Sequence, residues 1–289
     1  MGAANVIPGV SGGTIALITG IYERLINAIK SFNLGALKLL MKRQWRAFWT
    51  VTDSTFLLAL FAGIGFSIVS LAKLLEFLLE KHETLTLAFF SGLILVSIFF
   101  VGKTVKQWSP TAWLMLLAGI VIAAGIAFLA PASENNSFFY VFLCGIVAMC
   151  SMILPGLSGS FVLIIMGNYA LILAAIGSAD IGVLLPLALG CVFGMIAFSH
   201  LLSWIFKNYH DQTIAMMTGF IAGSLLIIWP WKNTLTESIA REGKPAKEVV
   251  TGYDWFIPSL TDGNTLLAIL LAIGGALALY AMEKLASKP

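Results

Sequence analysis

The stretch Ile7-Pro8-Gly9-Val10-Ser11-Gly12-Gly13-Thr14, which runs on to Gly20-Ile21-Tyr22, occurs again as Leu154-Pro155-Gly156-Leu157-Ser158-Gly159-Ser160, which runs on to Gly167-Asn168-Tyr169. We name residues 7–22 the first motif and residues 154–169 the second motif. Pro and Gly are poor residues for a helix interior, yet both motifs lie in hydrophobic sequence. Helix breakers at matching positions in two halves of a membrane protein indicate a binding site where the halves meet. The doubled stretch therefore predicts a transporter.

The composition places most of the chain in a membrane. Hydrophobic residues make up 59% and charged residues 11%, and the mean hydropathy is +0.96, whereas a soluble domain carries about 25% charged residues. Apolar runs of roughly the 17–25 residues that a spanning helix needs occur at 55–79, 85–101, 111–130, 182–206, 213–229 and 265–281. The sequence therefore predicts an all-α polytopic membrane protein with six full transmembrane helices.

The remaining composition excludes several classes of site. The net charge of +3 comes from Lys and Arg in the loops, so it does not indicate a nucleic-acid partner. The three cysteines, Cys144, Cys150 and Cys191, lie in apolar segments without C-x-x-C spacing, so neither a disulfide framework nor a metal site is predicted. We expect no cofactor.

The internal repeat extends beyond the motifs. Residues 63–97 align without a gap on 190–224, which predicts two related units, 1–131 and 132–289, the second with an external loop at 231–263. Residues 138–153 supply a first arm for a hairpin around the second motif. Because the first motif has no such arm within the chain, we expect an upstream hydrophobic segment in the natural protein.

The loop charges give the two units opposite orientations. Basic residues concentrate in 38–46, 103–106 and 284–288, and basic loops favour the cytoplasmic face. On this assignment the two motif hairpins open to opposite faces, although Lys81 then lies outside and counts against the scheme. We therefore predict two inverted-topology repeats, each with a re-entrant hairpin and three transmembrane helices, and a cytoplasmic C-terminus.

An anion is the ligand that such a pair of breaks would attract. A helix beginning near 11–14 and another near 158–160 would present unpaired N–H groups and a partial positive charge. Serine and threonine add hydroxyls there, and glycine allows close approach. The alternative is that these small residues serve helix packing and kinking. The candidate binding residues in the motifs are Asn5, Pro8, Gly9, Ser11, Gly12, Gly13, Thr14, Pro155, Gly156, Ser158, Gly159 and Ser160.

Charged residues within apolar segments extend this candidate site. Lys73 and His200 occupy aligned positions of the two halves, so a cation from each half would reach one phosphate; the alternative is that both snorkel to an interface. Glu23 and Arg24 follow the first motif and are either ligand-binding or an ion pair at a helix end. His200 or Glu23 would also carry a proton if transport is coupled to one.

The residues resemble a known family. Residues 2–14 with 20–26, and 154–160 with 166–169, are similar to the two signature motifs of the bacterial and archaeal polyprenyl-phosphate transporters. The resemblance implies a multi-pass cytoplasmic-membrane protein that returns undecaprenyl phosphate from the outer to the cytoplasmic leaflet for reuse as a lipid carrier. It also implies membrane lipids as neighbours, and it leaves the oligomeric state and the coupling ion open.

Two other functions compete with this expectation. Undecaprenyl-diphosphate phosphatases share a similar Pro-Gly-x-Ser turn, but Gly12 and Gly159 stand where an Arg follows the Ser in those enzymes. No nucleophile–base pair stands out, so we expect a transporter and not an enzyme. A transporter of a small anion would use the same helix ends. For a polyprenyl phosphate, the tail would stay in lipid beside a lateral opening lined by residues such as 17–21 and 161–165.

Overall fold

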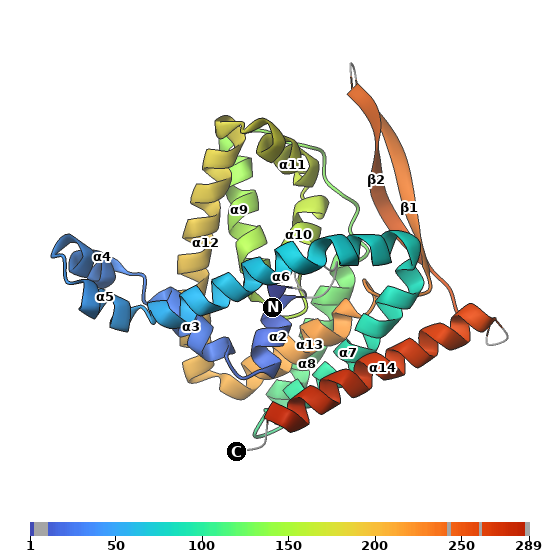
Figure 1. The fold of residues 1–289 in the computed structure, drawn as a ribbon, viewed down its shortest axis with the longest axis horizontal. Coiled ribbons are helices and arrows are strands. Elements are labelled where there is room, and N and C mark those ends of the chain that lie inside the picture. Colours follow the sequence, from blue (N-terminus) through green and yellow to red (C-terminus); the bar gives the residue numbers. More distant parts are fainter. Residues whose placement is uncertain (3–10, 242–243, 260–261, 287–289) are drawn as a thin grey trace.

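The computed structural model describes residues 1–2, 11–241, 244–259 and 262–286 (Figure 1). It is predominantly helical. The long helices are α6 (Ser54–Lys81), α7 (Glu83–Lys103), α12 (Ile181–Asn208) and α14 (Gly263–Ala286), and the helices of intermediate length are α8 (Pro110–Ile126), α9 (Phe138–Ile153) and α13 (His210–Ser224). The short helices are α2 (Gly12–Ile18), α3 (Tyr22–Lys30), α4 (Leu34–Met41), α5 (Trp45–Val51), α10 (Gly159–Ile165) and α11 (Tyr169–Ser178).

Four helices of the described chain are long and apolar enough to cross a membrane, which makes this a multi-pass membrane protein. They are α6, α7, α12 and α14. The pair α10–α11 passes the same test together but is bent by 110°, as a broken span or a re-entrant loop would be. The other two of the six expected spans correspond to α8 and α13, which are shorter, with 17 and 15 residues, so six full spans stay a prediction.

Helix α13 ends early because other groups bind the carbonyls beyond it. The Trp255 indole donates to the Leu226 carbonyl at 2.9 Å, and the Ser91 hydroxyl donates to the Ile228 carbonyl at 3.1 Å. The Lys232 ammonium donates to the carbonyl of Ile227. These partners replace the bonds that a further helical turn would make, so the apolar run at 213–229 is longer than its helix.

A β-hairpin stands where the sequence predicted a loop at 231–263, so the chain is not wholly helical. Strands β1 (Lys232–Arg241) and β2 (Lys244–Trp255) pair antiparallel, with Lys232 opposite Trp255. At the base of the hairpin the Lys232 ammonium lies 4.3 Å from the Tyr253 ring centroid. Burial lowers the pKa of Lys232 to about 8, while the charge of Glu83 opposes the shift.

The helix boundaries repeat at the positions that the sequence repeat predicts. Ser11 precedes α2 and Ser158 precedes α10 as the N-cap residue, and both helices have seven residues. Gly20 and Gly167 then break the chain at φ angles of 70° and 75°. Helices α6 and α12 both have 28 residues. The two halves therefore fold locally in the same way.

The halves pack crosswise. Helix α7 packs along α14, and its counterpart α13 packs along α8, so one type of contact is made twice between the halves (Figure 1). Small residues bring the backbones together: a Cβ at Gly92 would lie 1.8 Å from the Ala272 carbonyl oxygen, and one at Gly119 would lie 2.3 Å from that of Met216. Close backbone approach at small residues is how helices associate in membranes.

Helices α4 and α5 project from the bundle (Figure 1). They expose apolar side chains, with Leu34 and Met41 each 77% exposed and Trp45 62% exposed. Lys38 and Arg46 lie on the same segment. This combination of apolar and basic side chains is typical of a segment that lies on a membrane surface.

Gly20 and Gly167, which occupy matching positions of the two motifs, allow a matched test of backbone packing. Both need a positive φ, which costs an alanine about 1–2 kcal/mol. A Cβ at Gly20 would meet nothing within 4 Å, whereas one at Gly167 would lie 2.1 Å from the Ala132 carbonyl oxygen. We expect Gly167→Ala to lower the melting temperature of the purified protein in detergent well below that of Gly20→Ala. Equal melting temperatures for the two variants would contradict the close packing of Gly167 against the Ala132 carbonyl.

Candidate functional site

The first and second motifs are in direct contact. The Ser11 hydroxyl donates to the Leu154 carbonyl at 3.2 Å, and the Gly156 amide donates to the Thr14 hydroxyl oxygen at 3.0 Å. The Tyr22 hydroxyl donates to the carbonyl of Ile153 at 2.9 Å. Ser11, Thr14 and Tyr22 are 3%, 1% and 1% exposed. The two breaks therefore meet inside the protein, as the doubled sequence predicts.

Each motif caps a short helix with a serine. The Ser11 hydroxyl oxygen also accepts from the Gly13 amide at 3.1 Å. In the second motif the Ser158 hydroxyl oxygen accepts from the Phe161 amide at 3.5 Å and lies 2.9 Å from the Ser160 hydroxyl. Ser158 is half-buried and Ser160 is exposed. The serines of the second motif are thus more accessible to a ligand than Ser11.

The motif glycines allow backbones to pack closely. A Cβ at Gly13 would lie 2.6 Å from the Ile153 carbonyl oxygen, and a Cβ at Gly159 would lie 2.8 Å from that of Ala148. Gly156 has a φ of +81°, and a Cβ there would lie 2.6 Å from the backbone of Phe220 and Ile221. These contacts give the glycines the packing role that the sequence left open, and anion binding by them stays a prediction.

The charged candidates next to the first motif form ion pairs at helix ends. The Arg24 guanidinium contacts the Asp53 carboxylate at 2.6 and 3.0 Å and lies 4.4 Å from the Phe56 ring centroid. The Glu23 carboxylate lies 3.3 Å from His210 Nε2. These pairs join α3 to the start of α6 and to the start of α13. They match the ion-pair alternative that the sequence offered.

Lys73 and His200 lie outside the bonded contact between the motifs. Lys73 is exposed on α6, and Nδ1 of His200 lies 2.9 Å from the Ile196 carbonyl of its own helix. In the described part of the chain, no hydrogen bond or ion pair joins either residue to a motif. A role for these two cations at the headgroup therefore stays a prediction. Asn5, Pro8 and Gly9 lie outside the described residues, and Pro155 is buried.

The sequence reasoning missed two groups of residues. Tyr22 was quoted within the motif but not chosen, although its recurrence as Tyr169 was a signal. His210 was not among the candidates, yet it lies between Glu23 and Asp211, and a carboxylate oxygen of Asp211 is 3.2 Å from His210 Nδ1. Asp211 also accepts from the backbone amides of Lys106 and Gln107. No pattern in the sequence marks that cluster.

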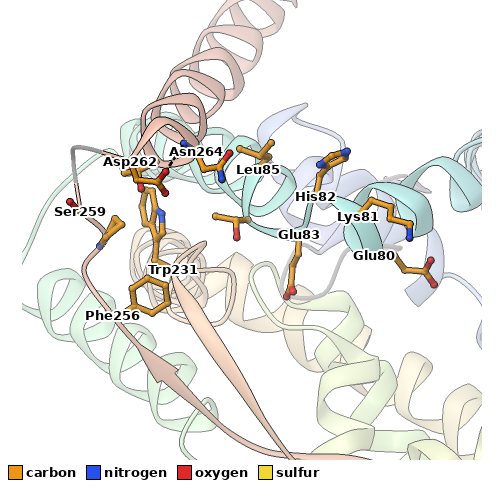
Figure 2. Close-up of a pocket in the computed structure, with 13 residues that line it drawn as sticks. Glu80, Lys81, His82, Glu83, Leu85, Trp231, Phe256, Ser259, Asp262 and Asn264 are labelled. Carbon is orange, nitrogen blue, oxygen red and sulfur yellow. Dashed lines mark hydrogen bonds between the residues drawn. The ribbon is translucent and has the colours of Figure 1, made fainter.

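Two cavities of similar size have opposite chemistry. One, of about 550 Å³, lies between α8, α12 and α13 and is walled mainly by apolar side chains such as Phe198 and Met216. The other, of about 510 Å³, lies at the α6–α7 turn (Figure 2). Its lining includes three carboxylates and two basic side chains: Glu80, Glu83 and Asp262, with Lys81 and His82. Because like charges repel, this second cavity is a poor site for a phosphate.

Known proteins resemble this chain along its length. Residues 1–246 match a family model described as undecaprenyl phosphate translocase-like. A polyprenyl-phosphate transporter of Vibrio cholerae is 38% identical over 291 residues, covering 100% of this chain and 94% of the relative. A polyprenyl-phosphate transporter of Staphylococcus aureus is 30% identical over 248 residues, covering 80% of this chain and 83% of the relative. No solved structure matches the chain.

The bond between Thr14 and Gly156 tests the contact between the motifs. Thr14→Val removes the acceptor and leaves a buried amide unpaired, which costs about 1–3 kcal/mol, whereas Thr14→Ser retains the oxygen. We expect Thr14→Val to lower the melting temperature in detergent and Thr14→Ser to lower it less. Valine and serine variants of equal stability would contradict the bond.

Proposed function

The chain belongs to the undecaprenyl phosphate translocase-like family, and from this premise we propose that it moves polyprenyl phosphate from the outer to the cytoplasmic leaflet of the cell membrane. Both curated relatives carry the name polyprenyl-phosphate transporter. Such a function returns the lipid carrier for reuse without changing it covalently, so the protein acts as a transporter and not as an enzyme. The exposed apolar helices fit a protein surrounded by membrane lipids.

The phosphate headgroup binds where the two motifs meet. The observation that carries this proposal is the buried contact between Thr14 and the Gly156 amide, which joins the start of α2 to the turn between α9 and α10. Thr14 accepts a bond there, so its hydroxyl hydrogen can donate to an anion. Ser158 and Ser160 share one hydrogen bond, which leaves a second hydroxyl hydrogen for the ligand. Helix N-termini add a partial positive charge.

Two inverted repeats would give this site access from either face. The matching bounds of α2 with α10 and of α6 with α12 support the repeat. The crosswise packing of α7 on α14 and of α8 on α13 supports a pseudo-two-fold relation. Rocking of one half against the other around the shared site would then expose the headgroup to each leaflet in turn. In this scheme the C-terminus is cytoplasmic.

Reconstituted transport tests the function. Proteoliposomes containing the protein should move labelled polyprenyl phosphate between leaflets, and liposomes without protein should not. Sulfate and chloride uptake, measured in parallel, tests a small-anion transporter, and phosphate release from polyprenyl diphosphate tests a phosphatase. Thr14→Val should move the lipid more slowly than Thr14→Ser. Movement of the small anions without movement of the lipid, or phosphate release, would overturn the proposal.

Protons couple to transport in this proposal through Glu23. Its carboxylate lies 3.3 Å from His210 Nε2, and the pair joins α3, which follows the first motif, to α13 of the second half. We expect inward transport to rise when the outside is acidified, and Glu23→Gln and His210→Gln to remove that dependence. His200→Gln tests the carrier that the sequence suggested.

The opposite outcome has a clear meaning. A transport rate that ignores the pH gradient and is unchanged in all three variants would remove proton coupling. Facilitated movement of the lipid down its own gradient would then remain.

A further inference from the structure

The apolar cavity between α8, α12 and α13 has an inner end at the second motif. Leu154 lines that end, and its carbonyl accepts the hydrogen bond from Ser11. Phe220 lines it as well, and its backbone lies where a Cβ of Gly156 would reach. The cavity therefore begins at the residues that join the two motifs, beside the proposed headgroup site.

Apolar and polar side chains are segregated along this cavity. Its walls are formed by side chains such as Met115, Phe198, Ile205 and Met216. The polar lining residues come from the start of α8 and from the turn between α12 and α13, at the other end: Thr111, Tyr209, Gln212 and Thr213. A phosphate could not cross such a wall without losing its hydration, so the cavity suits the apolar part of a lipid.

We propose that this cavity holds the polyprenyl chain of the transported lipid, with the isoprene units next to the phosphate against Leu154 and Phe220. The proposal rests on the proposed function, since it assigns a place to the tail of the same substrate. A volume of about 550 Å³ lies within the roughly 300–1,000 Å³ of typical ligand pockets. A long polyprenyl chain exceeds it, so the distal units lie in the bilayer.

Thioether and aromatic side chains suit this occupant. Met115, Met216 and Met217 contribute to the lining, and methionine adapts its shape to irregular apolar ligands. A chain with a double bond in every isoprene unit is irregular in this sense. This cavity lies elsewhere than residues 17–21 and 161–165, where the sequence suggested a lateral opening for the tail. The two possible positions of the tail can therefore be distinguished by experiment.

Photocrosslinking tests the path directly. The full-length protein in proteoliposomes is exposed to polyprenyl phosphate with a diazirine on an isoprene unit near the phosphate, and mass spectrometry locates the adducts. We expect adducts on α8, α12 and α13 around Met115, Ile205 and Met216, reduced by excess unlabelled polyprenyl phosphate but not by phospholipid. Adducts confined to 17–21 and 161–165, or equal competition by phospholipid, would overturn the proposal.

Matched tryptophan variants separate the tail path from the function itself. Met115→Trp and Ile205→Trp fill the cavity, whereas Leu114→Trp and Leu201→Trp place the same ring on neighbouring outward positions that are 59% and 49% exposed. We expect the cavity variants to lose the adducts and to transport about tenfold more slowly. A factor of this size corresponds to keeping roughly two CH2 groups of the lipid chain from being buried.

The outcomes distinguish the two proposals. Folding of each variant is checked by its melting temperature in detergent. If the wild type transports and the folded cavity variants transport equally well, the tail path is wrong and the function stands. If the wild type does not move the lipid, the proposed function itself fails.

Discussion

A chain that breaks its helices inside an apolar environment must still pair every backbone amide and carbonyl that the break releases. In lipid no water is available, and each unpaired group costs several kcal/mol. The break in the second motif releases the carbonyls of Ile153 and Leu154 and the amide of Gly156. Side chains of the first motif pair all three, through Tyr22, Ser11 and Thr14. The first motif docked on the second break therefore stabilises it.

The same constraint links the site to the rest of the bundle. The motifs can meet only if the halves are held at a fixed separation, and the crosswise helix pairs provide that separation through backbone contacts at Gly92 and Gly119. Such contacts leave no space for a side chain, so they fix the helices more strictly than interdigitated leucines would. The ion pairs of Arg24 with Asp53 and of Glu23 with His210 then connect the first motif to the helices beside it.

The sequence predicted those features that depend on repetition and periodicity. The meeting of the motifs and the matching helix bounds both followed from residue patterns. The early end of α13 and the β-hairpin did not follow from such patterns. The first depends on Trp255, which binds the Leu226 carbonyl from 29 residues along the chain, and the second depends on the pairing of β1 with β2. The roles assigned to Lys73 and His200 came from their alignment alone, and alignment does not determine which way a helix faces. His210 aligns with Glu83 in the other half, so the two halves do not share a histidine there and repetition gave no signal for it.

The bonds between the motifs also break the symmetry that the duplicated sequence suggests. Thr14 supplies the oxygen that accepts from Gly156, but the corresponding position of the second motif is Phe161, which has no side-chain oxygen. The mirrored hydrogen bond therefore cannot form. The first motif supplies side chains and the second motif supplies the backbone groups that they bind, so the two copies are not interchangeable. In the proposed mechanism, in which the halves rock against each other, this asymmetry would give the two end states different free energies and make the ligand-free molecule rest facing one side.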